Sequence, residues 1–364
     1  RNPDKVGHAV LANLLNGGFQ GTLVPVNPSA GEILGLAVCP SLEHFSGEID
    51  LGIIVLPAAQ VKDAVESCLA SGARAVIVIS AGFKEVGQEG AEAERELVAL
   101  CEASGARLMG PNCLGVLNTH HKMNATFAPS VPPEGRIAVI SQSGALCVAI
   151  LDWAASQGIG MSKVISIGNK ADLDEVAFLQ ALTADDSTNV IAGYLESINE
   201  GDAFLRAAEE AATVKPVVVL KVGVTQAGAR AASSHTGSLA GADIAYGAAF
   251  KRSGVIRAEN IEALFDYALA FTFQPLPAGN RIAVITNAGG PGIMAADATE
   301  SLKLQMTAPT EATRESLRKV LPAAAAVGNP IDVIGDADPD RYIRAFERVQ
   351  KDPNFDGVLV VVTP

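Results

Sequence analysis

Short apolar runs rich in Val and Ile alternate along this chain with longer stretches in which apolar residues recur every three or four positions. In two of these stretches, residues 60–71 and 88–104, Glu, Arg and Gln occupy the remaining positions, as is typical of amphipathic helices. This alternation predicts repeated βαβ units around parallel sheets, so the expected fold class is α/β. The predicted strands are residues 22–26, 51–56, 75–79, 107–109, 136–140, 163–167, 190–194, 216–222, 281–286 and 357–362.

Two loops rich in Pro and Gly, residues 128–135 and 274–280, interrupt this alternation. Each leads into the same five residues, Arg-Ile-Ala-Val-Ile, at positions 136–140 and 281–285. In both places this strand runs into a loop of small polar residues and glycine, so the two openings are related. The pattern predicts three domains. They comprise residues 1–128, 129–276 and 277–364.

Composition narrows the classes of ligand. The 364 residues carry 27 Lys and Arg against 40 Asp and Glu, a net charge of −13, which argues against binding of nucleic acid or of an anionic membrane. The 49% hydrophobic content, with only 5% aromatic residues and 35 Gly, suits buried parallel sheets. The five cysteines form no CxxC pair, and no apolar run reaches the length of a membrane span. We therefore expect a soluble protein of the reducing cytoplasm.

The most informative histidine is His235, which lies in a loop of small residues after the strand predicted at 216–222. Small neighbours let an anionic partner approach the imidazole, which is nucleophilic near neutral pH and can carry a phosphoryl group. The alternative is a hydrogen-bonded histidine in a surface loop. His8 and His44 are isolated, and His120 with His121 has no carboxylate or cysteine at ligand spacing, so no metal site is predicted.

A second candidate site follows the strand at 136–140. Ser141, Ser143, Gly144 and Ala145 open an apolar helix that we expect to begin near Leu146, and unpaired N–H groups at a helix start can bind phosphate. An ordinary capped helix is the alternative.

Glu196 follows the strand at 190–194 and is expected at the carboxyl edge of the same sheet, where open α/β folds gather their sites. A carboxylate there can orient an imidazole and fix its tautomer. The alternative is a solvated charge at a strand end.

In the first predicted domain, four strand ends carry Pro, Gly or small polar residues and are expected to line one crevice. Ordinary loop chemistry is the alternative, since no GxGxxG motif is present. Cys113 lacks a local base and is interpreted as a lining residue rather than a nucleophile. The candidate ligand-binding residues are Val26, Asn27, Pro28, Leu56, Pro57, Ser80, Ala81, Gly82, Asn112 and Cys113.

Over essentially its whole length the chain resembles the NDP-forming acyl-CoA synthetases, which include ADP-forming acetyl-CoA synthetase and the succinyl-CoA synthetase α chain. Residues 17–28 and 110–115 resemble that family's CoA-binding domain. Residues 215–237 resemble the segment that ends in its phosphorylated histidine, and this is the most specific match. The loop at 141–144 resembles the start of a phosphate-binding helix, and Glu196 falls where the family keeps the partner of the histidine.

The resemblance implies a Rossmann-like CoA-binding domain followed by two flavodoxin-like parallel-sheet domains, the last one truncated. It implies the reversible conversion of acyl-CoA, phosphate and ADP into carboxylate, CoA and ATP, through an acyl phosphate and phospho-His235. The ten strand-end residues named above would then bind CoA. A small carboxylate is the other product, and the family leads us to expect an oligomer.

Two parts of the family's pattern are missing from these residues. Its first strand and CoA-contacting glycine loop would precede Arg1, and its second phosphate-binding helix would follow Pro364, so we expect a fragment of a longer protein. The ATP-grasp domain that binds ATP or ADP with Mg²⁺ is also absent. We expect it on a missing segment or on a β subunit, with the small residues 227–234 forming a mobile loop that carries the phosphoryl group to it.

Two other functions remain open. The chain can be the acyl-CoA-synthetase-like sensor module of a protein lysine acetyltransferase, although a sensor does not need His235 and Glu196. It can also be a Rossmann-type CoA-binding regulator, in which replacing His235 changes nothing.

Overall fold

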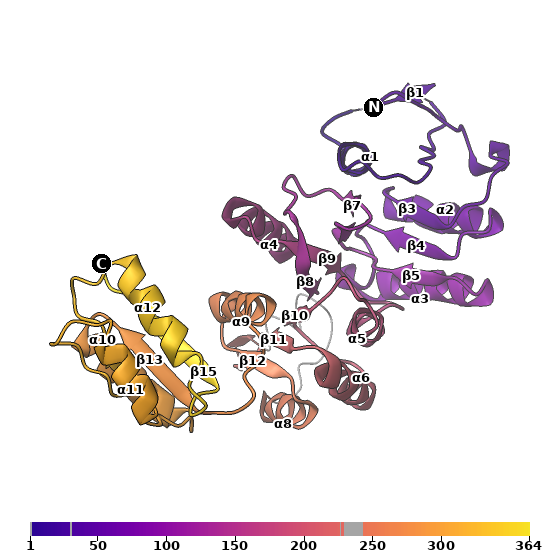
Figure 1. The fold of residues 1–364 in the computed structure, drawn as a ribbon. Helices are drawn as coiled ribbons and strands as arrows, with labels where there is room; N and C mark the ends of the chain where they lie inside the picture. The colour runs from indigo at the N-terminus through magenta and orange to yellow at the C-terminus, as the bar shows by residue number, and fades with distance from the viewer. Residues whose placement is uncertain (1, 30, 226, 229–242) are drawn as a thin grey trace. The chain divides into compact units, whose positions relative to one another are not determined.

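The structure is a computed structural model that describes residues 2–29, 31–225, 227–228 and 243–364. Its contacts divide the chain into two compact units, Arg1–Gln274 and Pro275–Pro364. Each unit contains a parallel sheet with helices packed on it (Figure 1), and the predicted α/β class is confirmed.

The first unit contains a small parallel sheet in the order β3-β4-β5. One face of it packs against two helices whose buried residues, Val61 and Val65 on one and Leu97 on the other, contact Val76 and Leu108 of the strands. The elements are α1 (Val6–Asn16), β1 (Glu32–Ile33), β2 (Leu36–Ala37), the 3-10 turn Leu42–His44, β3 (Leu51–Ile54), α2 (Ala58–Ala70), β4 (Ala75–Val78), the 3-10 turn Lys84–Val86, α3 (Gln88–Ala103) and β5 (Arg107–Met109).

The same unit contains a seven-stranded sheet in the order β12-β11-β10-β8-β9-β6-β7. Strands β8 to β12 are parallel, and β6 runs antiparallel to both β9 and β7. Helices α5, α6 and α8 pack on one face and α4 and α9 on the other (Figure 1). The elements are β6 (Gly115–Asn118), β7 (Met123–Thr126), β8 (Glu134–Ser141), α4 (Gly144–Gln157), β9 (Met161–Ser166), α5 (Glu175–Thr183), β10 (Val190–Leu195), α6 (Gly201–Val214), β11 (Val217–Lys221), α8 (Asp243–Ser253), β12 (Ile256–Ala258) and α9 (Ile261–Phe273).

One hydrophobic core joins the two sheets of the first unit. It contains Ile77 and Met109 of the small sheet together with Ala138 and Ile165 of the large one. Asn13 of α1 also donates to the carbonyls of Thr126 and Ala128, at 2.8 and 2.9 Å, next to the outermost strand β7. Strands β6 and β7 precede the domain boundary predicted at residue 128, but they belong to the large sheet, because β6 pairs with both β7 and β9. The three-domain division stays a prediction.

The second unit has a three-stranded parallel sheet in the order β14-β13-β15. Its core packs Leu317 of α11 and Val349 of α12 against Ala283 and Ile285 of β13. The elements are β13 (Ile282–Thr286), α10 (Gly289–Ser301), α11 (Glu311–Arg318), β14 (Ile331–Asp332), α12 (Pro339–Val349) and β15 (Gly357–Val361).

Both helices predicted by spacing are confirmed as α2 and α3, but the strand predicted at 22–26 is wrong. There the chain forms only an isolated bridge between Val26 and Cys39. Pro25 has no N–H group to donate to a ladder, and Pro28 follows closely, so a regular strand cannot extend through this segment.

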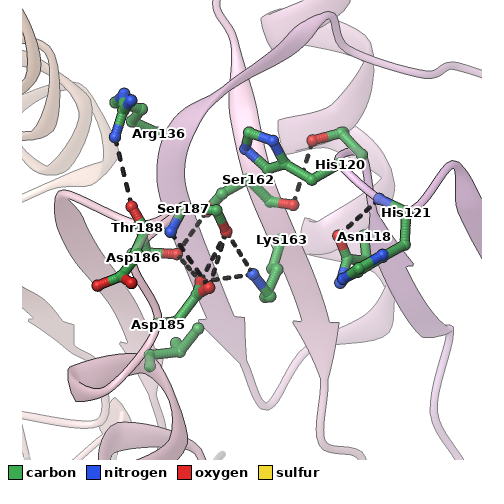
Figure 2. A network of polar contacts seen from close by, with 12 residues as sticks. Asn118, His120, His121, Arg136, Ser162, Lys163, Asp185, Asp186, Ser187 and Thr188 are labelled. Carbon is green, nitrogen blue, oxygen red and sulfur yellow. Dashed lines mark hydrogen bonds and ion pairs between the residues drawn. The ribbon is translucent and has the colours of Figure 1, made fainter.

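At the amino edge of the large sheet, a polar network joins β9 to the segment that precedes β10 (Figure 2). Lys163 of β9 donates to the Asp185 carboxylate at 2.5 Å and to the Ser187 hydroxyl at 2.7 Å. Thr188 donates to the same carboxylate at 2.6 Å. Burial alone raises the pKa of Asp185, but the hydrogen bonds from Lys163, Thr188 and Ser187 hold it well below its usual range.

On the opposite side of the sheet from α5 and α6, Trp153 of α4 packs against Phe265 of α9. Their ring centroids are 4.5 Å apart at an interplanar angle of 44°. This aromatic pair fixes α4 against its neighbouring helix.

Candidate functional site

The predicted helix start is present, and α4 begins at Gly144 directly after the loop that follows β8. Ser143 is the N-cap, and its Oγ accepts the Leu146 N–H at 3.2 Å. The Ser141 hydroxyl accepts the Ser143 N–H at 3.1 Å and donates to the Ser143 carbonyl at 3.0 Å. Since the first N–H groups of a helix have no helical acceptor, Gly144 and Ala145 are placed to donate to an anion.

Glu196 directly follows β10 and is buried, at 7% exposure. The side chain of Gln142 holds its main chain: Gln142 Oε1 accepts the N–H groups of Glu196 and Ser197 at 2.6 and 2.9 Å. Gln142 Nε2 donates to the Ser197 carbonyl at 2.7 Å. Gln142, which precedes the N-cap Ser143, is therefore hydrogen-bonded directly to the main chain of Glu196.

A buried ion pair lies beside this contact. Lys170 Nζ is 3.0 Å from both carboxylate oxygens of Glu175, and the two side chains are only 5% and 1% exposed. Lys170 also donates to the Ser197 carbonyl at 2.8 Å. Burial lowers the pKa of Lys170 and raises that of Glu175, because a charged group loses its hydration in the interior.

A second buried lysine, Lys221, ends β11 at the same edge of the sheet. Its Nζ donates to the carbonyls of Glu196 and Val222 at 2.8 and 2.5 Å. The ammonium also lies 4.4 Å from the ring centroid of Tyr246 on α8, a cation–π contact. Burial lowers the pKa of Lys221.

The candidate phosphoryl carrier His235 lies outside the described residues, as does most of the small-residue segment 227–234. The described chain leads toward it from Lys221 through Thr225 and resumes with α8 at Asp243. Its place relative to Glu196 therefore stays a prediction.

The structure brings together three of the four strand ends predicted to bind a ligand in the first unit. The Leu56 N–H donates to Ser80 Oγ at 3.0 Å, and the Asn112 N–H donates to the Ser80 carbonyl at 2.9 Å. Pro57, Ala81, Gly82 and Cys113 lie next to them in sequence at the carboxyl edge of β3, β4 and β5. The segment of Val26, Asn27 and Pro28 bonds instead with Cys39, whose carbonyl accepts the Asn27 N–H at 3.0 Å.

Cys113 is buried, and its thiol donates to the Val78 carbonyl at 3.4 Å. Burial raises the pKa of this thiol to about 12, so it stays protonated at neutral pH. This agrees with a lining residue and not with a nucleophile.

The loop after β5 lies against the start of α4, so the two groups of candidate residues are neighbours. A Cβ added to Gly144 would lie 3.6 Å from the Leu114 nitrogen and 3.7 Å from Ser166 Oγ. The Leu114 N–H in turn donates to Ser166 Oγ at 3.0 Å.

The loop after β9 binds the same segment from the other side. Asn112 Nδ2 donates to Asn169 Oδ1 at 3.3 Å, and the Asn169 N–H donates to the Pro111 carbonyl at 2.9 Å. At Gly168, with φ +56°, a Cβ would lie 2.3 Å from that Pro111 carbonyl oxygen, so only glycine fits this approach.

Sequence reasoning missed the four residues that organise this edge, namely Gln142, Lys170, Glu175 and Lys221. Lys221 could have been found, because a charged residue ends the otherwise apolar strand Val217–Lys221. The other three carry no such local signal. Their partners lie far away in the sequence, as with Gln142 and Ser197, and only the fold brings them together.

The described residues contain no group of three or more His, Cys, Asp or Glu side chains that could hold a metal ion. Nor does any helix in that part of the chain have the length and apolar character needed to cross a bilayer.

Three family models match successive parts of the chain. Residues 1–119 match a CoA binding domain, residues 134–271 a succinyl-CoA ligase like flavodoxin domain, and residues 282–362 a Ligase-CoA domain. The CoA-binding domain thus comes first and the flavodoxin-like domain second, as the resemblance found in the sequence implies.

Individual relatives match the whole chain. It is 49% identical over 360 residues to acetate–CoA ligase [ADP-forming] I of Archaeoglobus fulgidus, a match that covers 99% of this chain and 52% of the relative. It is 44% identical to the α subunit of acetate–CoA ligase [ADP-forming] II of Pyrococcus furiosus, covering 99% of this chain and 78% of that subunit. The chain thus spans about half the length of the Archaeoglobus relative.

A solved structure is similar to this chain in the same way as these two relatives are. The acetyl-coenzyme A synthetase 1 of Ca. Korarchaeum cryptofilum, in complex with phosphate and ADP, superimposes with a TM-score of 0.96 at 38% identity. That match covers 100% of this chain and 78% of the other. The chain belongs to the family of NDP-forming acyl-CoA synthetases.

Proposed function

We propose that this chain is the CoA-binding and phosphoryl-accepting part of an ADP-forming acyl-CoA synthetase, an acid–thiol ligase. The observation that carries the proposal is the packing of the α4 N-terminus against the loop after β5. A phosphate held at Gly144 and Ala145 then lies next to the edge at which CoA would bind, so phosphate and thioester can meet.

CoA would bind at the carboxyl edge of β3, β4 and β5. Leu56, Ser80 and Asn112 already form one hydrogen-bonded rim there. Pro57, Ala81, Gly82 and Cys113 would complete this rim, and Val26, Asn27 and Pro28 would contact CoA from their own segment.

In the first step a phosphate oxygen attacks the carbonyl carbon of the acyl-CoA thioester. The new C–O bond forms as the C–S bond breaks, and CoA leaves as a thiolate that takes up a proton. The N–H groups at the start of α4, with the hydroxyls of Ser141 and Ser143, would neutralise the phosphate charge during this attack.

In the second step a ring nitrogen of His235 attacks the phosphorus of the acyl phosphate. The P–N bond forms as the bond to the acyl oxygen breaks, and a small carboxylate leaves. The Glu196 carboxylate would accept the N–H of the other ring nitrogen and stabilise the positive charge that develops on the imidazole.

The phosphoryl group would then move from His235 to ADP, which makes ATP. ATP or ADP, with Mg²⁺, would bind to an ATP-grasp domain or a β subunit outside these residues. The Pyrococcus relative is an α subunit by name, which supports a partner of this kind. We further propose the three domains 1–128, 129–276 and 277–364, an oligomeric assembly and a cytoplasmic location.

The test is incubation of the complete protein, with its ATP-grasp part and Mg²⁺, with γ-labelled ATP. We expect acid-labile, alkali-stable label on the wild type and none on His235→Ala. The matched control is His121→Ala, because His121 is exposed at the amino edge of the large sheet (Figure 2) and should keep its label.

Label that survives in His235→Ala, or no label on either protein while CoA still binds, would overturn the synthetase proposal. The second result would favour a CoA-binding sensor. A converse assay with labelled phosphate and acetyl-CoA, without nucleotide, should label His235 through the acyl phosphate.

A further inference from the structure

The Glu196–Ser197 segment is held in an unusual way, because all its main-chain polar groups bond to buried side chains. Strand pairing of β10 ends at Leu195. Beyond it, Gln142 binds both N–H groups, Lys221 binds the Glu196 carbonyl, and Gln142 and Lys170 bind the Ser197 carbonyl. Side chains from three other segments therefore fix the place of the candidate acid.

Gln142 connects this segment to the phosphate-binding end of α4. It precedes the N-cap Ser143, and its own N–H donates to the Tyr194 carbonyl at 3.1 Å. A shift of the α4 start would therefore strain the three bonds that the Gln142 side chain makes with Glu196 and Ser197. Gln142 therefore links the candidate phosphate site directly to the main chain of Glu196.

Lys221 connects the same segment to the chain that leads to His235. It is 3% exposed, and its ammonium donates to the carbonyls of Glu196 and Val222, which follow the paired strands β10 and β11. Burial removes the hydration of the ammonium, and packing alone does not explain this cost, because an apolar side chain of similar length would pack as well.

We propose that Gln142 and Lys221 are positioning residues for phosphoryl transfer: they hold the Glu196 main chain at the carboxyl edge of the seven-stranded sheet, beside the start of α4. The inference rests on the proposed function, since it assigns Glu196 the role of partner to His235. Misplacement of a catalytic group by about 1 Å can lower a rate about 100-fold.

The principal variant is Lys221→Met, which keeps the aliphatic length and removes both hydrogen bonds. Its matched control is Lys163→Met, which removes a partly buried lysine from the opposite edge of the same sheet (Figure 2). Both are made in the complete protein with its ATP-grasp part. The rate of histidine labelling from labelled phosphate and acetyl-CoA, the direction in which Glu196 would act, is measured in single turnovers without nucleotide.

We expect Lys221→Met to lower the labelling rate about 100-fold with an unchanged half-saturating concentration of acetyl-CoA, and Lys163→Met to stay within about twofold. Lys221→Arg keeps donors to both carbonyls and should recover part of the rate. Gln142→Met leaves Lys221 in place and should lower the rate in the same way, which provides the test if Lys221→Met does not fold.

A double-mutant cycle separates positioning from general damage. In a Glu196→Gln background, Lys221→Met should lower the rate no further, because its effect passes through Glu196. Additive losses would overturn the inference, as would equal losses in Lys221→Met and Lys163→Met.

Failure of the underlying function gives a different result. If Glu196→Gln and His235→Ala both label normally, the proposed function fails and the inference with it. If both lose label while Lys221→Met and Gln142→Met retain the wild-type rate, only the inference fails.

Discussion

The two edges of the seven-stranded sheet both contain buried or partly buried lysines, but these lysines make different contacts. At the amino edge, Lys163 meets the Asp185 carboxylate, and Ser187 and Thr188 complete the bonding of that carboxylate. The low pKa of Asp185 shows that the folded protein stabilises this charge. The network contributes to stability and faces no candidate ligand residue.

At the carboxyl edge, Lys170 and Lys221 donate to main-chain carbonyls beside Glu196. Burial lowers the pKa of both lysines and raises that of Glu175, so the folded protein disfavours these charges. Hydrogen bonds thus compensate the burial of charge at the amino edge, whereas at the carboxyl edge charge is buried at a cost in hydration. Charged groups whose burial is costly but which hold a main-chain segment in place are typical of functional sites.

The largest effect that we expect comes from Lys170→Met. The change leaves Glu175, 1% exposed, as a buried carboxylate without its cation, and should lower the free energy of unfolding by about 3–5 kcal/mol. Urea unfolding followed by circular dichroism measures it.

The control for that variant removes the whole pair. Lys170→Met with Glu175→Leu should recover most of the loss, because replacing both members of a buried ion pair by apolar residues is often nearly neutral. If Lys170→Met alone lowers the free energy of unfolding by less than about 1 kcal/mol, the carboxyl edge does not differ from the amino edge in the cost of its buried charges.

Lys163→Met should be milder. Asp185 keeps its bonds from Ser187 and Thr188, so we expect a loss of about 1–3 kcal/mol in the same unfolding measurement. If Lys163→Met lowers the free energy of unfolding as much as Lys170→Met does, the two edges do not differ in how much stability depends on their lysines.

The pH dependence of stability gives a third comparison. The pKa of Asp185 is lowered in the folded state, so its contribution is fully present above the unfolded value of about 4 and is lost as the pH falls through the lower folded value. In Asp185→Asn, stability should therefore fall less steeply below about pH 4 than in the wild type. Urea midpoints measured at several acidic pH values give this slope, and an unchanged slope would contradict the assignment.

The smallest effect should come from Arg136→Ala, at the rim of the amino-edge network. Its guanidinium donates to the Asp186 carbonyl at 3.4 Å (Figure 2) and to Asn189 Oδ1 at 3.2 Å, and both partner residues are exposed. The unfolding free energy should change by no more than about 0.5 kcal/mol. A larger change would extend the stabilising network beyond Asp185 and its neighbours.

The regular elements of the core were predictable because their signals are local. Val190–Leu195 and Val217–Lys221 are apolar runs buried on both faces, as expected of central parallel strands. The β6–β7 hairpin was missed because Gly115–Asn118 and Met123–Thr126 are short and mix polar with apolar residues. Its register depends on pairing with β9, which no local pattern records.

In the candidate site, too, features with a local sequence signal were predictable and long-range contacts were not. The start of α4 was predictable from Ser141 to Ala145, because capping chemistry lies within a few adjacent residues. The contacts of Gln142 and Lys221 with Glu196 were not, since they join three strand ends that are distant in the sequence. The start of α4 followed from a local motif, whereas the bonds of Gln142 and Lys221 to Glu196 required the fold.

Trp153 is the only tryptophan in the 364 residues, and its ring lies against Phe265 with centroids 4.5 Å apart. It belongs to α4, whose first turn is the candidate phosphate site. The intrinsic fluorescence of these residues under indole excitation therefore comes from one helix. A change in its emission on addition of phosphate would report on the environment of α4 itself, without an attached dye.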